Sequence, residues 1–180
     1  MCAPVSLTRR SDMHSESARA SSAAEARFRI DDPNSRPRLV KVVALDRPSQ
    51  AVVERLAQNQ WSGASFLIAS AFEPQGCSQF SIQNWLSDLT GRTKHLLDEI
   101  NGADLVVMIA TAGENASAAA IIGEACSLRR VMTSALVLGG ASATDEALSK
   151  TLAQLRPWAL MLVIASSDEY IADMLSALRA

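Results

Sequence analysis

The sequence has little cysteine, no excess of charge of either sign and no long apolar run. Its three cysteines, Cys2, Cys77 and Cys126, are widely spaced, and no C-x-x-C pair or Cys/His cluster accompanies them. Neither a disulfide framework nor a zinc site is therefore indicated, and a reducing compartment is expected. The formal net charge of −2 leaves no electrostatic footprint for nucleic acid or an anionic membrane.

Segments that would export the chain or anchor it in a membrane are also missing. Arg9-Arg10 is followed by polar residues, where a secretory signal needs a run of roughly 7–15 apolar residues. The longest apolar runs, such as residues 158–165, are far shorter than the roughly 20 residues that span a bilayer. These absences predict a cytoplasmic protein with no membrane span and no nucleic-acid partner.

The composition divides the chain into a tail and one domain. Residues 1–38 are rich in Arg, Ser and Ala and show no apolar periodicity, so they are predicted to be a disordered tail. Residues 39–180 have an ordinary globular composition and are predicted to form a single domain.

From residue 39 onward, short apolar runs alternate with amphipathic stretches. Strands are expected at residues 39–45, 65–69, 104–110, 132–138 and 159–165, and helices after residue 49 and at about 82–100, 116–128, 143–155 and 168–178. Repeated βα units predict a three-layer, Rossmann-like α/β fold, in which an open parallel sheet of about five strands has helices on both faces.

The strands at 39–45 and 104–110 are expected to be central neighbours, because the second is apolar on both faces. Ligands in such folds bind at the carboxyl ends of the strands, where the strand order reverses. The turns at 46–49 and 111–117 should therefore face one another across this point. The candidate binding residues there are Asp46, Arg47, Ser49, Thr111, Ala112, Gly113, Asn115, Ser117, Gly139 and Gly140.

A short motif surrounds the third predicted strand. Ala103-Asp104, the apolar run 105–110 and Thr111-Ala112-Gly113 follow one another, and residues 119–125 continue as a helix. This order resembles the FtsZ/tubulin GTPase family, in which Ala-Asp, an apolar strand and Thr-Ala-Gly precede a Gly/Thr-rich phosphate loop. The resemblance extends over roughly residues 39–178 and implies a nucleotide-binding α/β domain with GTP or GDP at the turns.

Both phosphate turns of that family are altered in this chain. Residues 114–117 read Glu-Asn-Ala-Ser in place of the Gly/Thr-rich loop, and residues 46–49 contain no glycine, which close backbone approach to a phosphate requires. Ser49 is instead expected to cap the helix that follows it. Glu114 is expected to satisfy the free N–H groups before the 116–128 helix and to repel a phosphate. The chain also ends before the region that supplies the family's water-activating acidic residues, so no GTP hydrolysis is expected.

Two functions remain open at this point. The first is a degenerate, non-catalytic FtsZ/tubulin-like domain that acts as an interaction or regulatory module, with a protein partner or self-association, no cofactor and at most weak GTP or GDP binding. The alternative is a Rossmann-like protein or enzyme that binds a nucleotide or small ligand at the 46–49 and 111–117 turns. The alteration of both turns favours the first. No catalytic or metal-binding residue is assigned, and Cys126 is expected to be a small core residue.

Overall fold

The computed structural model describes residues 38–69, 86–165, 168–178 and 180. These residues belong to one compact unit, Ser35–Ala180. The predicted tail lies outside the described residues except for Arg38, as does the start of the helix predicted at about 82–100.

Within the described residues, a seven-stranded sheet with the order β4-β3-β2-β1-β5-β6-β7 forms the middle layer. The parallel part consists of β1 (Val40–Ala44), β2 (Ala64–Ala69), β5 (Leu105–Thr111), β6 (Met132–Leu138) and β7 (Met161–Ala165). The predicted open parallel α/β sheet is thus confirmed. The central pairing is confirmed as well, because β1 lies beside β5.

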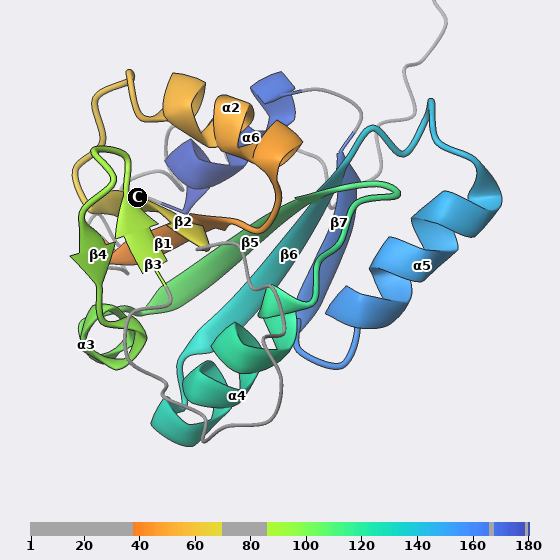
Figure 1. The fold of residues 1–180 in the computed structure, drawn as a ribbon. Coiled ribbons are helices and arrows are strands. Elements are labelled where there is room, and N and C mark those ends of the chain that lie inside the picture. The colour runs from red at the N-terminus through yellow and green to blue at the C-terminus, as the bar shows by residue number, and fades with distance from the viewer. Residues whose placement is uncertain (1–37, 70–85, 166–167, 179) are drawn as a thin grey trace, which may run out of the picture. The chain divides into compact units, whose positions relative to one another are not determined.

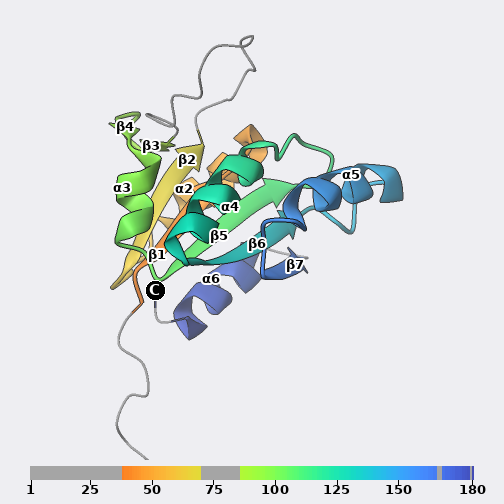
Figure 2. The same ribbon diagram turned by 90° about the horizontal axis from the view of Figure 1, so that it is seen from below.

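Helices cover both faces of the sheet (Figures 1 and 2). On one face lie α2 (Arg47–Leu56) and α6 (Asp168–Ala177), and on the other lie α3 (Leu96–Asn101), α4 (Ala118–Arg129) and α5 (Asp145–Leu155). None of the helices in the described ranges is long and apolar enough to span a membrane.

The central strands contribute side chains to the apolar clusters on both faces of the sheet. Val42 and Val107 belong to the apolar cluster beneath α2 and α6, whereas Val43 and Met108 belong to the cluster beneath α3, α4 and α5. All four side chains are buried. Because successive strand residues point to opposite faces, a strand covered on both sides is apolar throughout, which explains the composition of β5.

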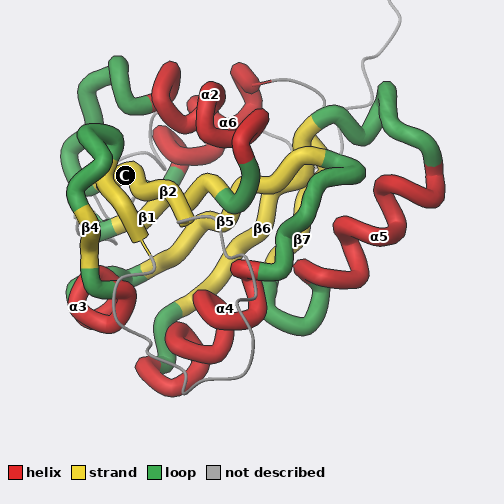
Figure 3. Tube along the Cα trace, viewed as in Figure 1, coloured by secondary structure: helices red, strands yellow, loops and turns green. Residues whose placement is uncertain are grey.

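The long helix predicted at about 82–100 is wrong for residues 86–95. This segment contains β3 (Leu86–Asp88) and β4 (Thr93–Lys94), an antiparallel hairpin that extends the sheet beyond the predicted strands (Figure 3). The hairpin turn is fixed by Asp88, whose Oδ1 accepts hydrogen bonds from the backbone amides of Thr90 and Arg92, both at 2.9 Å, and by Gly91 with a φ of 79°. This turn chemistry outweighs the helical spacing of the leucines.

Candidate functional site

The strand order reverses between β1 and β5, because β2 lies beyond β1 whereas β6 and β7 lie beyond β5. The turns that follow β1 and β5 meet at this point, as predicted. The backbone amide of Thr111 donates a 2.7 Å hydrogen bond to Asp46 Oδ2, and the Thr111 hydroxyl donates a 3.0 Å bond to Asp46 Oδ1. The crevice where ligands of this fold class bind is therefore bridged by a carboxylate of the chain itself.

Asp46 is also the N-cap of α2. Its Oδ1 accepts the backbone N–H of Ser49 at 2.7 Å, and Ser49 Oγ accepts the backbone N–H of Asp46 at 3.2 Å. The expectation that Ser49 caps this helix is thus wrong. The helix begins at Arg47, so Ser49 is the buried third residue of a reciprocal capping box, and Pro48 lies in the first turn, where a missing N–H costs nothing.

The turn between β5 and α4 is closed by two side chains of α5. The backbone N–H of Gly113 donates to Thr151 Oγ1 at 2.9 Å, and that of Ala116 donates to Gln154 Oε1 at 2.6 Å. Thr151 is fully buried. Asn115 Oδ1 accepts a third amide, that of Ser117, at 3.0 Å. Three backbone donors of this turn that could bind a phosphate are therefore already bonded within the protein.

Glu114 does not have the role predicted for it. Its side chain is exposed, and the amides of Gly113 and Ala116 are satisfied by Thr151 and Gln154 instead. The backbone of Glu114 donates to the carbonyl of Thr111 at 3.1 Å, which tightens the turn. The physical reason is that α5 packs against this turn and brings neutral acceptors to it.

Gly139 and Gly140, which follow β6, have structural roles. Gly139 has a φ of 71°, and its carbonyl accepts the amides of Ser142 and Ala143 at 3.1 and 3.0 Å. A Cβ on Gly140 would overlap the side chain of Ile164. Both glycines thus have a structural reason, a left-handed turn in one case and close packing against β7 in the other.

The remaining candidates lie at the same end of the sheet. Arg47 and Ser117 are exposed, at the first position of α2 and the N-cap of α4 respectively. Ala112 is partly buried, and its amide donates to the carbonyl of Leu138 at 2.9 Å. Sequence reasoning placed the turns correctly but missed Thr151 and Gln154. The one signal for them was a polar pair at i, i+3 on an otherwise amphipathic helix.

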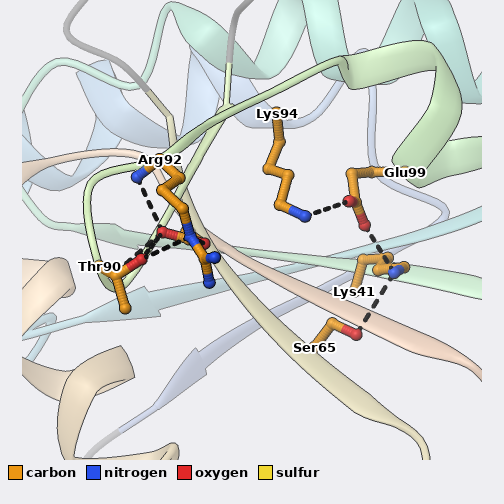
Figure 4. Close-up of polar contacts among 7 residues, drawn as sticks. Lys41, Ser65, Thr90, Arg92, Lys94 and Glu99 are labelled. Carbon is orange, nitrogen blue, oxygen red and sulfur yellow. Dashed lines mark hydrogen bonds and ion pairs between the residues drawn. The ribbon is translucent and has the colours of Figure 1, made fainter.

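A second polar cluster lies around the start of β1 and the hairpin (Figure 4). Lys41 Nζ lies 2.7 Å from Glu99 Oε2 and 3.3 Å from Ser65 Oγ, and Lys94 Nζ lies 3.7 Å from Glu99 Oε1. In the hairpin, the hydroxyl of Thr90 and then the amide of Arg92 hold the pKa of the Asp88 carboxyl well below its usual range. These contacts fasten α3 and the hairpin to the parallel strands.

The structure also contains a cavity of about 370 Å³, away from the switch point. It is lined by the end of α4, the start of β6 and the segment before β7, and includes Arg130, Thr133 and Trp158. None of the candidate site residues lines it. Within the described residues, no group of three His, Cys, Asp or Glu side chains is placed to hold a metal ion.

No family model matches the chain, and no curated protein does. Among solved structures, the chain is similar to the apo form of translation elongation factor SelB from Methanococcus maripaludis, with 12% sequence identity and a TM-score of 0.41. The match covers 78% of this chain and 36% of that one, so the chain spans about a third of its length.

Proposed function

We propose that this protein is a non-catalytic α/β domain that acts as an interaction or regulatory module, with nucleotide binding weak or lost. One observation carries this proposal: three backbone N–H groups at the switch point have acceptors within the protein. Thr111 donates to Asp46, Gly113 to Thr151 and Ala116 to Gln154. A phosphate entering here would have to displace three short hydrogen bonds and meet the Asp46 carboxylate.

We further propose that the domain is a degenerate relative of the FtsZ/tubulin GTPases. The Thr111-Ala112-Gly113 motif at the end of central β5 supports this relation. Asp46 and the α5 side chains then stand where such a relative would bind its nucleotide. On this proposal the scaffold is retained, while the phosphate loop is replaced by contacts that stabilise the fold.

Nucleotide binding is the test of the proposal. The purified chain is examined by thermal shift with GTP, GDP, ATP, NAD and FMN at about 1 mM. A ligand at about 100 times its dissociation constant stabilises a protein by about 2.7 kcal/mol, so binding with a constant of about 10 µM would be evident. We expect no shift and no GTP hydrolysis above background. A clear shift, or turnover that is lost on Ser117→Ala, would support the ligand-binding alternative.

Variants of the turn sharpen this test. Glu114→Gly alone is expected to leave nucleotide affinity weaker than millimolar, because Glu114 accepts neither the Gly113 nor the Ala116 amide. Glu114→Gly combined with Gln154→Ala frees the Ala116 amide and is expected to give measurable, weak GTP binding by calorimetry. Glu114→Gly with Ala153→Ser, an exposed neighbour on α5, is the matched control. Equal affinity in both double variants would contradict the role of Gln154.

A further inference from the structure

The two outer strands of the sheet differ in how they are protected from other chains. β4 is two residues long and contains Lys94, and short, charged edge strands resist pairing. β7, by contrast, has five residues, Met161-Leu-Val-Ile-Ala165, with no charge and no proline. Among the described strands, β7 has a neighbour on one side only, which is β6. β7 is thus the open edge of the sheet.

The direction of the backbone groups along β6 shows which N–H and C=O groups of β7 are hydrogen-bonded to β6. The amide of Ala112 donates to the carbonyl of Leu138, so Leu138 directs its backbone groups toward β5. Because this direction alternates along a strand, Ala135 and Val137 direct theirs toward β7.

In the register of the β6–β7 pair, these groups of β6 form hydrogen bonds with the backbone of Met161, Val163 and Ala165. It follows that Leu162 and Ile164 point their N–H and C=O groups away from the sheet. Ile164 is also 47% exposed, and Leu160, just before the strand, is 79% exposed. The open edge therefore combines free backbone groups with exposed apolar side chains.

Charge is distributed asymmetrically beside this edge. Helix α5 lies next to β7 and runs from the carboxyl end of the sheet toward its amino end (Figures 1 and 2). Asp145 and Glu146 are exposed at its first turn, and Arg156 is exposed just after its end. None of these side chains forms an ion pair within the part of the chain that the structure describes.

We propose that two copies of this chain associate through β7, antiparallel and about a two-fold axis at Val163. In this register Leu162 of one copy lies opposite Ile164 of the other, so the free N–H and C=O groups of both residues are exchanged as hydrogen bonds. The same axis places the two α5 helices antiparallel on one face, with the acidic end of each beside the basic end of the other. A two-fold contact of this kind is self-complementary. The inference rests on the proposed function, since it names the partner of a module that acts by association.

The mass of the full chain in solution tests the proposal. Light scattering and sedimentation at about 50 µM are expected to give twice the 19.2 kDa of one chain. Ile164→Lys places a charge in the centre of the paired edge and is expected to weaken association by at least roughly a hundredfold. Met132→Lys is the matched control, because Met132 is 46% exposed but lies in β6, inside the edge. It is expected to change the dissociation constant less than about threefold.

A charge-reversal pair tests the orientation of the two copies. Arg156→Glu is expected to weaken association about tenfold, and adding Asp145→Lys and Glu146→Lys to it is expected to restore the wild-type constant. All three side chains are exposed, so these changes leave the fold intact. Failure of the combined variant to recover would overturn the antiparallel arrangement.

Amide hydrogen exchange of the wild-type chain tests the register without any substitution. The amides of Leu162 and Ile164 are expected to be protected at high protein concentration and to exchange freely on dilution, whereas that of Val163 stays protected at both. A wild-type chain that is monomeric at about 50 µM, or a dimer unaffected by Ile164→Lys, would overturn this inference and leave the proposed function intact. Micromolar GTP binding by a chain that still dimerises would overturn the proposed function alone.

Discussion

The carboxyl and amino ends of this sheet are completed by different kinds of contact. At the carboxyl end, the polar side chains of Asp46, Thr151 and Gln154 accept backbone N–H groups of the turns. At the amino end, Trp158 packs against Gly123 of α4, and a cavity of about 370 Å³ remains beside it. The end that usually receives a ligand in this fold class is thus the filled one. The comparison teaches that the position of a crevice in the topology does not by itself make it a site.

The largest effect is expected from breaking the carboxyl end. Asp46→Ala removes the acceptor of the Ser49 amide and of the Thr111 amide and hydroxyl at once. Loss of an N-cap and of hydrogen bonds to a charged group should lower the free energy of unfolding by about 3 kcal/mol, as measured by urea denaturation. Asp46→Asn, which keeps one acceptor oxygen, should lose about half as much. Equal losses would mean that shape rather than charge holds the turns together.

A smaller effect is expected from the amino end, where packing dominates. In Gly123→Ala the new Cβ would overlap Trp158, whose Cγ would lie 2.9 Å away. Overpacking should lower the free energy of unfolding by about 2 kcal/mol in spite of the better helix propensity of alanine. Gly102→Ala is the control, since a Cβ there meets nothing within 4 Å. If Gly123→Ala matches the control in a melting experiment, the contact with Trp158 is looser than described.

The third prediction concerns Cys126, which lies in the apolar cluster beneath α3, α4 and α5. Its side chain is fully buried, and burial raises the pKa of the thiol from 9.0 to about 12. The unfolded chain therefore releases this proton before the native one does. Stability from this group is complete below the unfolded pKa and is lost as the pH rises toward the folded pKa. Between about pH 10 and 11, wild type should lose about 1.4 kcal/mol more than Cys126→Ala. Parallel pH profiles in denaturation would contradict the buried position of the thiol.

The smallest effect is expected at the ion pairs that two lysines form with Glu99. Lys94 lies 3.7 Å from Glu99 and is 42% exposed, whereas Lys41 lies 2.7 Å from the same carboxylate and is 17% exposed. Lys94→Ala should change the free energy of unfolding by less than about 0.5 kcal/mol. Lys41→Met should cost more, about 1–2 kcal/mol, because it leaves Glu99 without its near partner. The reverse ranking in urea denaturation would mean that the hairpin depends on Lys94.

Much of the fold could be predicted because its signals are local. A run that is apolar on both faces identified β5 as a central strand, and the pairing of β5 with β1 followed from the topology of βα units. The hairpin at residues 86–94 was missed because leucines at helical spacing hid a turn that Asp88 and Gly91 stabilise. In that segment the turn chemistry was the better local guide.

The position of the candidate site could be predicted from the sequence, but the hydrogen bonds that occupy its backbone amides could not. The two turns were expected to meet, and the bond between Asp46 and Thr111 shows that they do. The closure by Thr151 and Gln154 was missed, because each bonds an amide 38 residues earlier in the chain. Nothing local marks a helix residue as the acceptor for so distant a donor. Such contacts come from tertiary packing, which periodicity does not report.

The separation of these partners along the chain also affects how the domain folds while it is synthesised on the ribosome. The amides of Gly113 and Ala116 gain their acceptors only after Thr151 and Gln154, each 38 residues later, have been translated. β5 and α4 therefore emerge first with an incomplete turn between them. During that interval the nascent chain exposes amide groups that the finished domain conceals, so the turn becomes rigid only as α5 docks.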